Sequence, residues 1–134
     1  MAGNYKDGDI FADAVVNLAR GNPRSLRRAF QVIQKLEDEG EVSLAHLRLR
    51  ALCRVLVTMR LHATLAAEIA AELGSSPLAE RTDFALARDA FALTGDKSRS
   101  RLYAKRFEAT PDSAEELSAA TLVKASKRKR AQRA

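Results

Sequence analysis

Apolar residues recur with a helical period along most of the chain, in segments separated by residues that end helices. The segment before Gly40 shows the pattern clearly, since Leu26, Ala29, Ile33 and Leu36 share one face of a helix. No segment alternates with the period of two that marks a half-buried strand. The 134 residues fit one domain, and a chain of this length can bury a substantial core. The sequence therefore predicts an all-α, single-domain bundle of five or six helices.

Glycine and proline predict where the helices begin and end. Glycines at 21, 40, 74 and 95 are expected to stop helices, and Asn22-Pro23 is expected to start the second as N-cap and first helical residue. Pro77 would open the fourth helix in the same way. Ser43 caps a third helix that could run without interruption to residue 73, about 45 Å long. The fold prediction includes this one long central helix, with a break near 58–64 as the alternative.

The C-terminal part is predicted to contain one more helix and a tail. Ser113 and Glu116 form a capping box, which predicts a helix over 113–123. The bundle would then span residues 1–123, and the basic stretch 124–134 would be a flexible tail.

Several observations predict an intracellular protein without a membrane anchor. The single cysteine, Cys53, has apolar neighbours and is interpreted as a small buried hydrophobe. Segment 51–73 is apolar, but it carries ionisable residues that would each cost about 2.5–3.5 kcal/mol near the centre of a bilayer. The first residues contain no apolar run, so no signal peptide is expected. We expect a cytoplasmic location and no membrane partner.

Positive charge is concentrated in the last quarter of the chain. Residues 1–96 carry 12 Lys and Arg against 13 Asp and Glu, whereas residues 97–134 carry 11 against 4. This asymmetry favours a polyanionic partner.

The first basic site is predicted on the second helix, opposite its apolar face. It consists of Arg20, Arg24, Arg27, Arg28, Gln31 and Lys35. Cations in the first turn oppose the helix dipole, so helix stability does not explain them. Open N–H groups at the helix N-terminus would reinforce an anion site there. The interpretation is a rail about 16 Å long for a nucleic-acid backbone. The alternative is an ordinary solvated face, with some of its arginines pairing with acidic residues elsewhere.

Two further basic sites follow. The stretch 97–107 contains Arg99, Arg101, Lys105 and Arg106 interleaved with Tyr103 and Phe107. Cations and aromatic rings together are typical of single-strand binding, although core packing would also explain the rings, above all Phe107. The tail contributes Lys127, Arg128, Lys129 and Arg130, which could bind polyanions through counterion release, act as a localisation signal or simply aid solubility.

No catalytic, metal or cofactor site is predicted. The chain has no glycine-rich phosphate loop, no cysteine pair and no His-Glu-x-x-His, and His46 and His62 are too far apart for a helical metal pair. His62 is interpreted as a residue at the edge of the core. The acidic run 37–41 is interpreted as a solvated helix end. We therefore expect a protein that is not an enzyme and that uses no cofactor.

Residues 68–77 resemble the first helix and turn of a helix-turn-helix DNA-binding motif, with Ala70 and Gly74 at the motif's spacing. The resemblance implies a transcriptional regulator in which Ser75–Arg81 enters the major groove. Glu80 and Asp83 depart from it, because the motif needs apolar residues there. Residues 36–43 are similar to the opening of a winged helix, without the short second helix that should follow.

In size, helix content and basic faces, the whole chain also resembles the small subunit of multi-subunit CRISPR effector complexes. That resemblance implies a non-catalytic antiviral-defence protein whose basic faces hold strand phosphates while a guide RNA supplies sequence specificity. It implies copies of itself and other subunits as partners, with Val57 and Leu61 as candidate contacts. RNA or single-stranded DNA would be favoured over duplex. A helical protein–protein adaptor is the remaining alternative.

Overall fold

The computed structural model describes residues 2–111, with side chains from residue 8 onward. It contains six helices, namely α1 (Ala2–Ala19), α2 (Arg24–Asp38), α3 (Val42–Thr58), α4 (Ala63–Ser75), α5 (Arg81–Leu93) and α6 (Lys97–Ala109). No strand occurs in this part of the chain, so the all-α prediction is confirmed. The helix predicted over 113–123 and the tail 124–134 lie outside the described residues.

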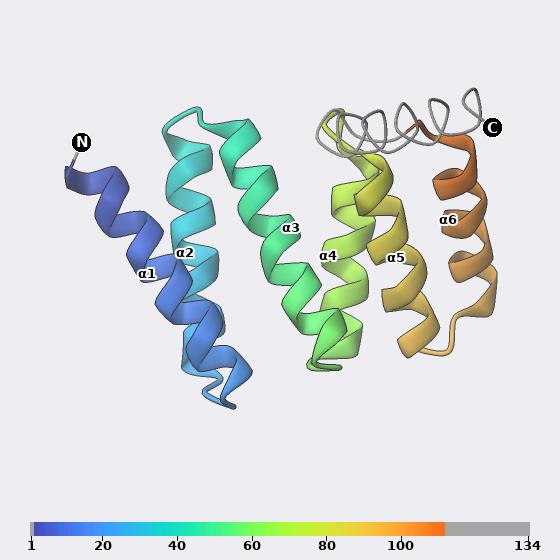
Figure 1. Cartoon of the computed structure of the whole chain (residues 1–134), viewed down its shortest axis with the longest axis horizontal. Helices are drawn as coiled ribbons and strands as arrows, with labels where there is room; N and C mark the ends of the chain where they lie inside the picture. The colour runs from blue at the N-terminus through green and yellow to red at the C-terminus, as the bar shows by residue number, and fades with distance from the viewer. Residues whose placement is uncertain (1, 112–134) are drawn as a thin grey trace, which may run out of the picture.

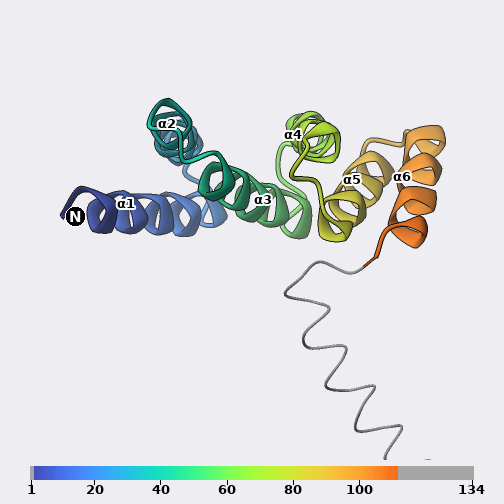
Figure 2. The same cartoon turned by 90° about the horizontal axis from the view of Figure 1, so that it is seen from above.

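The six helices form an elongated row in chain order, each antiparallel to the one before it (Figure 1). Seen from above, α2 and α4 lie on one side of the line formed by α1, α3 and α5 (Figure 2). α3 packs against both α1 and α5, whereas α2 and α4 each pack on α3 without touching one another. α3 is therefore the centre of the fold, and α2 and α4 are separated above it.

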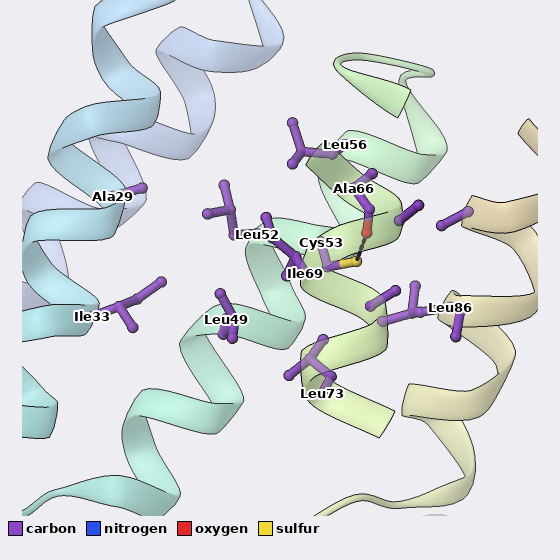
Figure 3. Packing of buried hydrophobic residues seen from close by; sticks show 14 of the residues in the cluster. Ala29, Ile33, Leu49, Leu52, Cys53, Leu56, Ala66, Ile69, Leu73 and Leu86 are labelled. Atoms are coloured by element: carbon purple, nitrogen blue, oxygen red, sulfur yellow. Dashed lines mark hydrogen bonds between the residues drawn. The ribbon is translucent and has the colours of Figure 1, made fainter. Parts of the chain in front are cut away.

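The core is aliphatic and centred on the α3–α4 contact (Figure 3). Leu52, Cys53 and Leu56 of α3 are completely buried. Ala66, also fully buried, lets α4 approach so closely that its carbonyl oxygen lies 3.6 Å from Cys53 Sγ. Cys53 is thus the buried small residue that the sequence predicted. Burial, with a smaller contribution from the charge of Asp83, raises the pKa of its thiol to about 12.

The predicted long central helix is wrong, and the alternative break is what the structure shows. α3 ends at Thr58 and α4 begins at Ala63. Leu61 N donates to Leu56 O at 2.8 Å and Arg60 N to Val57 O at 3.2 Å, which is the Schellman pattern that closes a helix. The same pattern closes α1, α2 and α5 with glycines at positive φ. At the end of α3 the residue in the left-handed conformation is Arg60, at φ 54°. The sequence therefore has no glycine there that would predict the turn.

The helix stop predicted over 74–77 is confirmed, because α4 ends at Ser75, but Gly74 is not its capping glycine and the predicted restart at Pro77 is wrong. Gly74 lies inside α4, and α5 begins at Arg81 rather than at Pro77. A Cβ atom on Gly74 would lie 3.1 Å from Tyr103 Cε1 and 3.6 Å from the nearest carbon of the Phe84 ring. Glycine is present here because two aromatic rings pack directly against the helix backbone.

Candidate nucleic-acid interface

The six residues predicted as a basic site on α2 and the turn before it are all exposed. They lie opposite the buried residues Ala29, Val32, Ile33 and Leu36. The guanidinium groups of Arg20, Arg24, Arg27 and Arg28 pair with no carboxylate among the described side chains. The described part of the chain therefore does not pair these four arginines with carboxylates, and an ordinary solvated face stays the alternative to a phosphate site.

One detail of this site differs from the prediction, because the first N–H groups of α2 are already occupied. Asn22 Oδ1 accepts from Arg24 N at 3.1 Å. Ser25 N and Leu26 N donate to the carbonyl oxygens of Asn22 and Pro23 at 3.2 and 3.3 Å. The predicted start at Asn22-Pro23 holds, but the helix end offers these N–H groups to no anion. Any anion binding on α2 must come from the side chains.

The second basic site lies on α6, which packs only against α5 among the described helices. Asp96 caps α6 by accepting from Arg99 N at 3.0 Å. The 13 residues of α6 carry five cations and one carboxylate. A shallow surface basin is lined by Lys97, Ser98, Arg99, Arg101, Leu102 and Lys105. Within the described chain, the side-chain nitrogens of Lys97, Arg101 and Lys105 have no hydrogen-bond or ion-pair partner.

The aromatic rings on α6 serve packing rather than the surface. Tyr103 is buried and stacks on Phe91, with ring centroids 5.6 Å apart and planes at 3°. Phe107 is half-buried, and its ring is covered by the guanidinium groups of Arg81 at 4.0 Å and Arg88 at 5.0 Å. Of the predicted combination of cations and stacking rings, only the cations are therefore available for binding on α6. Core packing, expected mainly for Phe107, applies more fully to Tyr103.

The structure does not bring the two basic sites together. Among the described helices, α2 contacts only α1 and α3, and α3, α4 and α5 separate it from α6 (Figure 1). The third predicted site, on the tail, lies outside the described residues. Val57 and Leu61, the candidate subunit contacts, are half-buried and pack against the core at the α3–α4 turn. His62, predicted at the core edge, is instead exposed in that turn.

Sequence reasoning missed a buried polar cluster around Asp83, which joins α3 to the start of α5. Asp83 is fully buried, and its two carboxylate oxygens accept hydrogen bonds from Arg50 Nε and Nη2, each at 2.8 Å. His46 Nε2 lies 2.9 Å from Oδ2, and Glu80 N donates to the same oxygen at 2.9 Å. Glu80 and Asp83 also form a capping box at the start of α5. The capping-box spacing was the one signal in the sequence that could have predicted this role.

The cluster keeps Asp83 ionised. Burial by itself raises the pKa of this carboxyl, but hydrogen bonds from Arg50, His46 and Glu80 N and the Arg50 charge outweigh it and hold the pKa below its ordinary value. No buried side-chain nitrogen or oxygen in the described region lacks a hydrogen-bond partner. The cluster is thus a satisfied structural contact.

The helix-turn-helix resemblance placed 75–81 in the major groove, and residues 76–80 form the connection between α4 and α5 rather than a helix. α5 packs against α3, α4 and α6, and Arg81 at its start donates from Nε to Phe107 O at 3.2 Å. Asp83, which departs from the helix-turn-helix pattern, is committed to the buried cluster. These contacts do not favour the regulator that the resemblance implied.

No family model, curated protein or solved structure matches the chain. Within residues 2–111, no helix combines the length and apolar character required to cross a bilayer. The described side chains include no group of three or more His, Cys, Asp or Glu residues placed to hold a metal ion. The function therefore has to be argued from the two basic surfaces.

Proposed function

We propose that this chain is a non-catalytic, largely sequence-independent nucleic-acid-binding subunit of a larger nucleoprotein complex, which holds backbone phosphates on α2 and α6. The observation that carries the proposal is a set of exposed cations with no carboxylate partner among the described residues, namely Arg24, Arg27 and Arg28 on α2 and Lys97, Arg101 and Lys105 on α6. Arg50 and Arg88, by contrast, are paired with Asp83 and Asp89. The fold therefore neutralises some arginines and leaves these surfaces positive.

Like charges on one helix face have a cost that a polyanion removes. Lys97, Arg101 and Lys105 are spaced four residues apart on α6, as are Arg24 and Arg28 on α2. Each such pair destabilises a helix by about 0.2–0.5 kcal/mol. A phosphate between two cations replaces repulsion with attraction. Within α6 only Glu108 is acidic, and the carboxylate of the N-cap residue Asp96 pairs with Arg99.

The chemistry of these surfaces predicts how binding depends on salt and sequence. Exposed Lys and Arg side chains contact phosphates and carry no information about base identity. Affinity should fall linearly with salt on logarithmic axes as counterions are released. Base stacking is not part of the proposal, because Tyr103 and Phe107 are occupied within the fold. The resemblance to the small CRISPR subunit adds no residue to this argument.

The test compares variants that each remove two cations. Arg101→Gln/Lys105→Gln alters α6, and Arg24→Gln/Arg28→Gln alters α2. The control is Arg54→Gln/Arg60→Gln, which removes two exposed arginines from α3 and the turn after it. Binding of labelled single-stranded and duplex oligonucleotides would be measured by fluorescence anisotropy across a salt series.

We expect each of the first two variants to bind more weakly than the control. The slope of log affinity against log salt should become shallower by about 0.7–0.9 for each phosphate that the variant no longer neutralises. If the control loses as much affinity as the others, only the total charge matters and the two surfaces are not the site. If the wild-type chain binds neither oligonucleotide near physiological salt, the proposal is wrong.

A further inference from the structure

A groove lies between α2 and α4, with α3 as its floor. It consists of two adjoining hollows of about 310 and 390 Å³, which share Glu37, Leu49 and Glu72 in their linings. The groove exists because α2 and α4 do not contact each other, although α1 and α5 both pack against α3 on the other side (Figure 2). The two hollows therefore lie side by side above α3, between α2 and α4.

Part of the groove's lining is apolar and exposed to solvent. Leu49 contributes to the floor of both hollows. Val42 and Leu78, at 58% and 39% exposure, line the hollow near the ends of α2 and α4. Covering such apolar side chains with a partner stabilises the complex by about 25 cal/mol for each Å² of apolar surface buried. The lining thus suits leucine-like side chains.

The charges in the groove favour a partner that carries positive charge. Glu37 and Glu72 lie in the last turns of α2 and α4, line both hollows, and have no cationic partner among the described residues. The C-terminal ends of α2 and α4 lie at the same edge of the row, the upper one in Figure 1, so the two helix dipoles add negative potential there. Arg27 is the one arginine or lysine among the described lining residues, and it borders only the second hollow; His46, which lines the first hollow, is bonded to Asp83.

We propose that this groove docks an amphipathic helix of a partner protein, with leucine-like side chains on α3 and a lysine or arginine between Glu37 and Glu72. The partner helix would lie over the two hollows, between α2 and α4. This assigns a role to part of the acidic run 37–41, which the nucleic-acid surfaces do not use. The second hollow shares Arg27 and Gln31 with the basic face of α2. The residues changed in the docking test belong to neither basic face, so failure of the docking proposal and failure of the proposed function can be told apart.

The test uses two synthetic helical peptides about as long as α2, with the same leucine stripe and either lysines or glutamates beside it. Binding would be measured by isothermal titration calorimetry and mapped by amide chemical shifts. Glu37→Lys/Glu72→Lys reverses the charge of the groove. Glu39→Lys/Glu68→Lys is the matched control, because both residues are exposed and neither lines the groove. Val42→Ser/Leu78→Ser removes exposed apolar lining without opening the core.

We expect the lysine peptide to bind wild type and the control, with shifts on Leu49 and its neighbours. The groove variant should bind it roughly tenfold more weakly, equivalent to about 1.4 kcal/mol, and the serine variant should also lose affinity. The oligonucleotide binding of the groove variant should not decrease. The proposal is overturned if the lysine peptide does not bind wild type, if both peptides bind alike, or if groove and control variants lose affinity equally.

Discussion

Replacing Asp83 by alanine should remove a large share of the stability of the fold. The change leaves Arg50, whose side chain is only 12% exposed, and the buried His46 without the carboxylate that both contact. Removing one partner of a buried ion pair costs about 3–5 kcal/mol, because the remaining charge stays desolvated. Arg50 keeps a second carboxylate, that of Glu80 at 3.5 Å, so the expected loss of unfolding free energy lies at the lower end of this range, about 3 kcal/mol. Domains of this kind are stable by only about 5–15 kcal/mol.

Urea unfolding followed by circular dichroism measures this loss directly. Asp89→Ala is the matched control on the same helix, since Asp89 pairs with Arg88 on the surface at 49% and 35% side-chain exposure. An exposed pair contributes about 0–1 kcal/mol. If Asp83→Ala costs less than about 1 kcal/mol, or no more than the control, the buried cluster does not hold α3 to α5 and the reasoning fails.

The same carboxylate predicts the acid dependence of stability. The pKa of Asp83 is lower in the folded chain than its ordinary value of 3.8. Its contribution is therefore complete above that ordinary value and is lost as pH falls toward the folded pKa. Unfolding free energies measured from about pH 7 to about pH 2 should fall less steeply below pH ~4 for Asp83→Asn than for wild type. Parallel curves for the two proteins would contradict this assignment.

Three further predictions concern single residues. Gly74→Ala should destabilise α4 in thermal unfolding, because the added methyl group meets the stacked Tyr103 ring. The matched change Gly8→Ala places a methyl group that meets nothing within 4 Å, so it should stabilise α1 by about 0.5–1 kcal/mol. Equal effects of the two changes would show that Tyr103 moves aside. Arg60→Gly should raise the unfolding free energy by up to about 1 kcal/mol by relieving the left-handed backbone at the α3–α4 turn, and a loss of stability would mean that the arginine side chain contributes there. Cys53 should resist thiol reagents at about pH 8 until the protein is unfolded in urea, since its pKa is about 12, and rapid labelling of the native protein would show that the core opens readily.

Local patterns in the sequence were enough to predict the class of fold and most helix boundaries. Apolar spacing and the glycines at 21, 40 and 95 are local signals, and the corresponding helix ends lie where these signals place them. The exposed face of α2 could also be predicted, because it follows from the position of the apolar stripe on the same helix. These features depend on residues no more than a few positions apart.

Other features depend on tertiary packing. The break after α3 has no glycine, and Arg60 accepts a left-handed conformation because Leu56 and Leu61 pack into the core around it. Gly74 continues a helix because Tyr103, far along the chain, packs against its backbone.

The pairing of charges also depends on residues distant in sequence. Asp83 meets Arg50 and His46 across 33 and 37 residues, and no local pattern specifies such a partner. The separation of α2 from α4, which creates the groove, likewise follows from how three helices pack rather than from any one segment. Local spacing fixes what each helix can bury, whereas only the assembled helices decide which charges remain exposed.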